Sequence, residues 1–271
     1  YCAIVLQWPW YLCLLAAMLF GAIWGALPGI FKAYLNINEV ITAIMFNWIG
    51  LYMVNDIMYG KGKSPMYDLA STKTYSLRKA APQAMIPSLG MSELFGKLQS
   101  VTIAIFIAIF FAIVVYIILN KTAFGYELRA CGFNKNAARY AGINEKRNII
   151  LAMMISGALA GVGAGLYYLS TVAEWNPQVS TALPAMGFNG ISTALLACSN
   201  PIGTIFSSLF ISYITVGGTK LSTQYYTKEI ADVITALIIY LCAFSLLFKN
   251  KIRALLVGKA KRVSVGKGGD D

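Results

Sequence analysis

The chain has 271 residues, of which 58% are hydrophobic and only 12% charged, with no histidine and a formal net charge of +11. A soluble domain has about 25% charged residues, so this composition excludes an ordinary soluble protein. Uncharged apolar runs of about 18 residues or more can cross a hydrocarbon layer of ~30 Å, and several such runs are present. The sequence therefore predicts an all-α fold, a polytopic transmembrane helical bundle that crosses the cell membrane several times.

Seven membrane crossings are expected within one transmembrane domain, which extends over residues 1–248. In chain order they are 11–31, 38–57, 100–120, 149–170, 183–198, 202–218 and 230–248. The chain begins at Tyr1 with an apolar piece that is too short to span, and we expect a further span upstream of it. A signal peptide has a basic region before its apolar core, whereas the first basic residue here is Lys32, so none is visible.

Charge in the connections between spans predicts the orientation. Four crossings separate the connection 121–148 from the basic tail 249–271, so both are expected on the same side, which the positive-inside rule makes the cytoplasm. The connection 58–99 is then extracytoplasmic, although it too has six basic residues, which conflicts with the rule. The density of basic residues is higher in 121–148, with six in 28 positions, than in 58–99, with six in 42. We therefore place the connection 121–148 in the cytoplasm.

Glycines recur at every fourth position in the first and fourth spans: Gly21, Gly25, Gly29, Gly157, Gly161 and Gly165. Such G-x-x-x-G stripes let helices pack closely in lipid, and packing alone explains each triplet. Similar strings follow, "MFNWIG" at 45–50 and "MGFNGI" at 186–191, and the first and fourth spans would run in opposite directions. Together these features favour an inverted-topology repeat with a substrate path at its interface.

The candidate substrate-path residues come from these two strings: Asn47, Trp48, Phe188 and Asn189. Interhelical hydrogen bonds and aromatic side chains at the lipid interface are the alternative interpretation of all four. Further along, Asn200–Pro201 divides the uncharged stretch 175–219 into two pieces of about 16 residues, which are short for a bilayer. This pattern fits either discontinuous helices that line a cavity or an ordinary tight helical hairpin.

The stretch "TAFGYELRACGFNKNAARYAGINEKRN" at 122–148 is a charged connection between two uncharged spans. Asn134 is suited to cap the start of a helix, and Gly142 is suited to the left-handed position that ends one. Between them, Ala137, Ala138 and Ala141 would form a small face that another protein could approach. A loop held at an anionic lipid surface by its basic residues is the alternative.

"TAFGYELRACGFNKNAARYAGI" resembles the cytoplasmic-loop signature of ATP-binding-cassette (ABC) importer permeases of the ribose, galactose and branched-chain amino acid class. "ISGALAGVGAGLYYL" and "GFNGISTALLACSNPIGTIFSSLF" resemble later blocks of the same permeases, so that the resemblance extends over about residues 17–218. "NEVITAIMFNWI" is most similar to the simple-sugar and nucleoside branch, which works with a nucleoside-binding lipoprotein. Cys131 and Lys135 depart from the signature, where valine or alanine and proline are common.

This resemblance implies a permease subunit of an ATP-driven importer for a nucleoside or a simple sugar. The implied partners are a separate ABC ATPase subunit, a second permease subunit (usually giving a heterodimer), an extracytoplasmic substrate-binding lipoprotein and the lipid bilayer, with no nucleic acid. The chain itself would be no enzyme, because ATP is hydrolysed in the partner. The signature places these residues at or beside the ATPase-coupling element: Glu127, Arg129, Gly132, Asn134, Ala137, Ala138, Gly142 and Ile143.

Other chemistry has little support in the sequence. "GKGKSP" at 60–65 is no phosphate-binding loop, since Ile57 stands where the motif needs glycine. An ion-coupled secondary transporter is the alternative function. Proton-driven carriers usually have carboxylates deep within their spans as proton relays, whereas Asp232 lies near the end of a predicted span. An intramembrane enzyme is supported less, and neither a metal nor a cofactor is expected. The scattered cysteines lack C-x-x-C spacing and favour neither a zinc site nor a disulfide framework: Cys2, Cys13, Cys131, Cys198 and Cys242.

Overall fold

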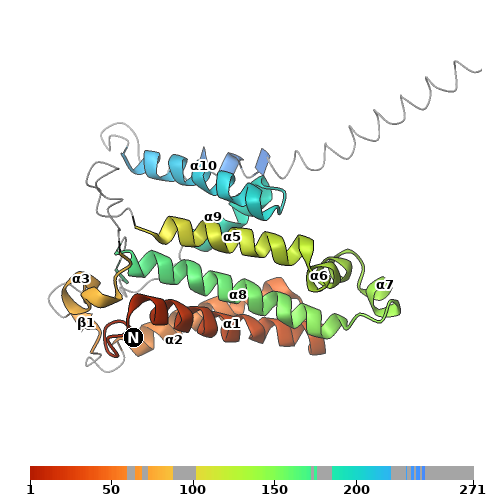
Figure 1. Cartoon of the computed structure of the whole chain (residues 1–271), viewed down its shortest axis with the longest axis horizontal. Helices are drawn as coiled ribbons and strands as arrows, with labels where there is room; N and C mark the ends of the chain where they lie inside the picture. Colours follow the sequence, from red (N-terminus) through yellow and green to blue (C-terminus); the bar gives the residue numbers. More distant parts are fainter. Residues whose placement is uncertain are drawn as a thin grey trace, which may run out of the picture. The chain divides into compact units, whose positions relative to one another are not determined.

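The computed structural model describes residues 1–59, 65–68, 73–87, 102–171, 174–175 and 185–220, with a few single positions between 230 and 241. Two compact units, Tyr1–Leu183 and Pro184–Asp271, divide the chain. Unit 1 contains α1 (Trp10–Leu35), α2 (Glu39–Tyr59), β1 (Tyr67–Asp68), β2 (Lys73–Thr74), α3 (Leu77–Ala80), η2 (Pro82–Ala84), α5 (Ala104–Lys121), α6 (Ala123–Phe133), α7 (Lys135–Tyr140) and α8 (Glu145–Leu169) (Figure 1). Unit 2 contains α9 (Ala185–Leu196) and α10 (Pro201–Lys220).

The polytopic helical fold is confirmed. Five helices in the described residues are long and apolar enough to cross a membrane: α1, α2, α5, α8 and α10. The predicted span 183–198 overlaps α9, which the structure describes from Ala185 to Leu196, and the residues directly before it lie outside the described ranges. Most of the predicted span 230–248 lies outside the described residues. Among the described residues, β1 and β2 form an antiparallel ladder of two residues per strand, with Tyr67 opposite Thr74 and Asp68 opposite Lys73.

Large apolar side chains cover the outside of these helices. In α5, for example, no residue is buried, and Phe106 and Phe110 are exposed. In water such a surface would be unfavourable, whereas the lipid of a bilayer solvates it and the helix satisfies its backbone hydrogen bonds internally. The apolar exterior and the helical backbone therefore have the same cause, which is the hydrocarbon solvent.

The two glycine triplets form one shared interface between α1 and α8, which lie side by side (Figure 1). A Cβ atom at Gly25 would lie 2.6 Å from the Met153 carbonyl oxygen and 2.9 Å from the Cα atom of Gly157. A Cβ atom at Gly21 would overlap the Gly157 carbonyl oxygen. Residue numbers rise along α1 as they fall along α8, so the helices are antiparallel. The backbones touch directly here because neither helix has a side chain between them.

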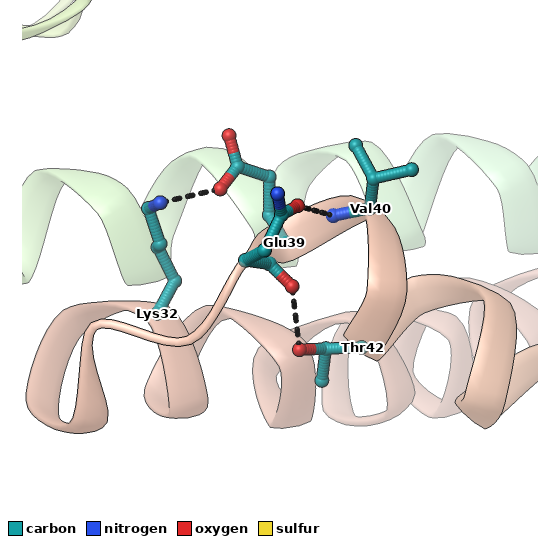
Figure 2. Close-up of polar contacts among 5 residues, drawn as sticks. Lys32, Glu39, Val40 and Thr42 are labelled. Carbon is teal, nitrogen blue, oxygen red and sulfur yellow. Dashed lines mark hydrogen bonds and ion pairs between the residues drawn. The ribbon is translucent and has the colours of Figure 1, made fainter.

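The connection from α1 to α2 lies at the end of unit 1 where α8 begins. The Lys146 ammonium nitrogen is 5.0 Å from the centre of the Tyr34 ring, which places the start of α8 against the end of α1. Across the connection, Lys32 in the last turn of α1 forms a 2.5 Å ion pair with Glu39, the first residue of α2 (Figure 2). The Thr42 hydroxyl donates to the Asn38 carbonyl oxygen at 2.9 Å, which anchors the first turn of α2.

The described part of the connection 58–99 lies at the opposite end of unit 1 from α6 and α7 (Figure 1). The Ile86 amide donates to the carbonyl oxygen of Leu169, the last residue of α8, at 3.2 Å. The Gln83 side-chain amide donates to the carbonyl oxygen of Gln7, just before α1, at 3.0 Å. Ala81, Ala84 and Ile86 are buried there. Residues 73–87 are thus attached to the ends of two spanning helices.

In unit 2, α9 and α10 form a tight helical hairpin. Cys198 and Ser199 turn the chain with φ of 50° and 58°, and the Asn200 side chain accepts from the Ile202 amide at 3.0 Å. The Ser207 hydroxyl donates to the Thr193 carbonyl oxygen at 2.8 Å, which joins the two helices. The hairpin alternative therefore describes how α9 and α10 are joined, and the discontinuous-helix alternative stays a hypothesis.

Candidate functional site

The connection between α5 and α8 contains two short helices, and a sharp bend introduces the first. Thr122 has extended backbone angles, and its hydroxyl oxygen accepts from the Gly125 amide at 3.1 Å. The same hydroxyl donates to the Ile118 carbonyl oxygen at the end of α5. A Cβ atom at Gly125 would overlap that carbonyl oxygen, so only glycine fits this bend. Gly125 was not predicted from the sequence, because a single glycine in a helical run has no periodic signal.

The helix α7 has a defined boundary at each end, formed by the two residues that the sequence singles out. The Asn134 side chain accepts from the amides of Asn136 and Ala137 at 3.0 and 3.1 Å. At the other end, Gly142 has φ of 79° and its amide donates to the Arg139 carbonyl oxygen. The Ile143 amide donates to the Ala138 carbonyl oxygen at 3.0 Å, which completes a Schellman motif. These bonds explain how a six-residue helix is held in place.

A buried side chain attaches α6 to α8. Asn148, in the first turns of α8, is only 2% exposed, and its amide nitrogen donates to the Glu127 carboxylate at 3.1 Å. Glu127, which the resemblance places at or beside the coupling element, thus uses its carboxylate for a bond inside the chain. Arg129 is exposed and donates to the Asn120 side chain at 3.2 Å. Asn148 was missed because its partner is 21 residues away in the sequence.

A groove of about 510 Å³ lies along α6 and α7. It is lined by Ala123, Tyr126, Glu127, Ala130, Phe133, Asn134, Ala137, Ala138, Ala141 and Ile143. Phe133 in this lining is 90% exposed, and Tyr140, which is not part of the lining, is 93% exposed. The predicted alanine face is only partly correct: Ala137 and Ala141 are exposed, but Ala138 is 3% exposed because it packs inside the chain. We call the exposed residues the α6–α7 surface: Gly132, Phe133, Ala137, Tyr140 and Ala141.

The candidate substrate-path residues belong to two different units of the chain. Asn47 and Trp48 lie near the middle of α2, where Asn47 is exposed and the Trp48 ring is stacked 6.3 Å from that of Tyr52. Phe188 and Asn189 lie in the first turn of α9, and Phe188 is exposed. An exposed amide halfway along a spanning helix is costly in lipid unless it meets a polar partner or water.

No group of three or more His, Cys, Asp or Glu side chains in the described ranges could hold a metal ion. The geometry of unit 1 is that of a helical membrane protein with a polar connection, in which α7 is capped at both ends, at one end of its spans.

The chain belongs to the family of permease components of the branched-chain amino acid transport system, whose model matches residues 1–243. It is 32% identical to the nucleoside ABC transporter permease protein NupB of Lactococcus lactis, over 95% of this chain and 69% of the relative. It is 31% identical to the guanosine ABC transporter permease protein NupP of Bacillus subtilis, over 93% of this chain and 68% of the relative.

A glucose ABC transporter permease protein of Haloferax volcanii is 25% identical, over 87% of this chain and 61% of the relative. No solved structure matches the chain. The resemblance seen in the signature at 122–143 is thus confirmed over most of the chain. The chain is a multi-pass membrane subunit of an ABC transporter and not an enzyme, and family membership does not support the ion-coupled secondary transporter.

Proposed function

We propose that the chain is the permease subunit of an ATP-driven importer whose substrate is a nucleoside. Two relatives above 30% identity are permease proteins for nucleosides or guanosine, whereas a glucose permease protein is 25% identical. A simple sugar is the second choice of substrate on the same ground. The substrate crosses along a path that includes Asn47, Trp48, Phe188 and Asn189. The exposed Asn47 supports this path, since a polar solute and water would satisfy its amide.

A separate ATPase binds the α6–α7 surface and drives the change of access from one side of the membrane to the other. The main observation behind this proposal is the exposure of Phe133 and Tyr140 in a polar connection outside the five spanning helices. Large exposed aromatic side chains are typical of interface centres, where they become buried on binding. Exposed Arg129, Lys135 and Arg139 surround them and favour a partner with acidic groups at the rim.

The proposed arrangement places 121–148 and the tail 249–271 in the cytoplasm and 58–99 outside, with the transmembrane domain over 1–248. A second permease subunit completes the pathway, and an extracytoplasmic lipoprotein delivers the substrate. The attachment of residues 73–87 to the ends of α1 and α8 supports a docking platform on that side.

The test is co-purification and uptake with the partner ATPase. We expect Tyr140→Ser, and more strongly the double variant with Phe133→Ser, to weaken ATPase association by about tenfold, since truncating a central interface aromatic costs more than about 1–2 kcal/mol. ATP-driven uptake of labelled guanosine into vesicles should fall in parallel. Tyr75→Ser is the matched control for ATPase association alone, because Tyr75 is an exposed aromatic at the opposite end of unit 1. Unchanged association in the double variant would reject this surface as the ATPase site.

A further inference from the structure

Asn148 belongs neither to the α6–α7 surface nor to the candidate substrate path, yet its side chain is among the most buried polar groups in the described residues. Its amide nitrogen lies 3.1 Å from a Glu127 carboxylate oxygen and 3.8 Å from the Cys131 sulfur. Glu127 and Cys131 are one helical turn apart, so both point from α6 toward the same spot on α8. The Asn148 side chain is therefore a joint between α6 and α8.

This joint precedes a part of α8 that cannot move independently of α1. Along the α1–α8 interface the backbones touch, with Gly157 between Gly21 and Gly25 and with Gly161 against Ala17. Sliding one helix along the other would push side chains such as those of Ala17 and Met153 into positions with room for hydrogen only. Near the joint, Lys146 also lies over the Tyr34 ring at the end of α1. We treat α1 and α8 as one rigid pair.

We propose that Asn148 is a positioning residue that transmits movement of the α6–α7 surface to the rigid pair α1–α8. This inference rests on the proposed function, because it presupposes an ATPase that displaces that surface. With the Asn148–Glu127 bond in place, displacement of α6 moves α8 and α1 together. Without the bond, α6 can tilt on the bend at Gly125 while α8 stays in place, and ATP is hydrolysed without transport.

The experiment uses the full chain reconstituted with its second permease, ATPase and binding protein in proteoliposomes. It measures substrate molecules transported per ATP hydrolysed, a ratio that a smaller amount of folded complex does not change. In Asn148→Ala we expect the ratio to fall about tenfold while ATPase association is retained, since a hydrogen bond to a charged group shifts a two-state equilibrium by about that factor or more.

Asn120→Ala is the matched control. Asn120 is likewise hydrogen-bonded to α6, as the acceptor from Arg129 at 3.2 Å, but it is exposed and joins α6 to α5 instead of α8. We expect this variant to keep the wild-type ratio. An equal fall in Asn120→Ala would show that any loosening of α6 uncouples the transporter and would overturn the role assigned to Asn148.

A rescue separates positioning from folding. Asn148→Asp places two carboxylates together and should lower the ratio as Asn148→Ala does. The double variant Glu127→Gln with Asn148→Asp reverses donor and acceptor, since the glutamine amide then donates to the aspartate, and should restore the ratio. A wild-type ratio in Asn148→Ala, or no restoration in the double variant, overturns the proposal. If the wild-type chain fails to bind an ATPase at all, the proposed function itself is wrong, which is a distinguishable result.

Discussion

At the scale of single residues, burial separates two alanines that the sequence treats alike. Ala137 and Ala138 are neighbours in α7, and both belong to the alanine face expected to meet a partner. In the structure Ala138 is packed inside the chain, whereas Ala137 is open to solvent. The sequence favours Ala138→Arg as the substitution that blocks docking. That variant is a poor test, because a buried arginine displaces α7 whether or not a partner exists.

The pair of alanines gives a sharper prediction. We expect Ala137→Arg to weaken ATPase association by about tenfold without lowering the melting temperature of the purified chain, since its side chain extends only into the interface. Ala138→Arg should lower both, because overpacking a filled site costs about 1–3 kcal/mol. Co-purification and thermal unfolding, measured on the same preparations, check this. Intact association in Ala137→Arg would argue against docking through this face of α7.

At the scale of elements, the six glycines of α1 and α8 serve one purpose, which is the close contact between these two helices. Each triplet predicts a close approach by some helix, but G-x-x-x-G spacing does not specify the partner. The structure pairs the triplets with each other, which gives the antiparallel pair a local two-fold relation. Such a relation is what an inverted repeat needs in its first and fourth spans, and the repeat remains a hypothesis.

Gly157 and Gly163, both in α8, test this interface. A Cβ atom at Gly157 would overlap the Gly21 carbonyl oxygen, whereas a Cβ atom at Gly163 meets nothing within 4 Å. We expect Gly157→Ala to destabilise the chain by about 1–3 kcal/mol, because the backbones must separate. Gly163→Ala should be neutral or slightly stabilising, because alanine is the better helix former. Thermal unfolding in detergent compares them, and equal melting temperatures would contradict the contact.

The limits of sequence prediction follow from the range of each interaction. Hydropathy and capping are local, so the spans begin and end within about five residues of α1, α2, α5, α8 and α10, and Asn134 and Gly142 bound α7. The Asn148–Glu127 bond is not local and leaves no periodic pattern.

At the scale of the whole molecule, orientation is the property on which the proposed function depends most. The segments 73–87 and 122–144 lie at opposite ends of unit 1, so a membrane around its spans puts them on opposite sides. Both connections are basic, and the positive-inside rule alone decides between them only through charge density. An ATPase needs cytoplasmic ATP, so the α6–α7 surface must face the cytoplasm for the importer mechanism to operate.

Thiol labelling decides the orientation directly. Lys79 and Asn136 are exposed at the two ends of unit 1, in α3 and in α7. In a background without the native cysteines, a membrane-impermeant thiol reagent applied to intact cells should label Lys79→Cys and leave Asn136→Cys unlabelled. Permeabilising the membrane should make the second site reactive. The opposite pattern would place the α6–α7 surface outside the cell, where no ATP-hydrolysing subunit could drive it, and both the docking proposal and the role of Asn148 would then be wrong.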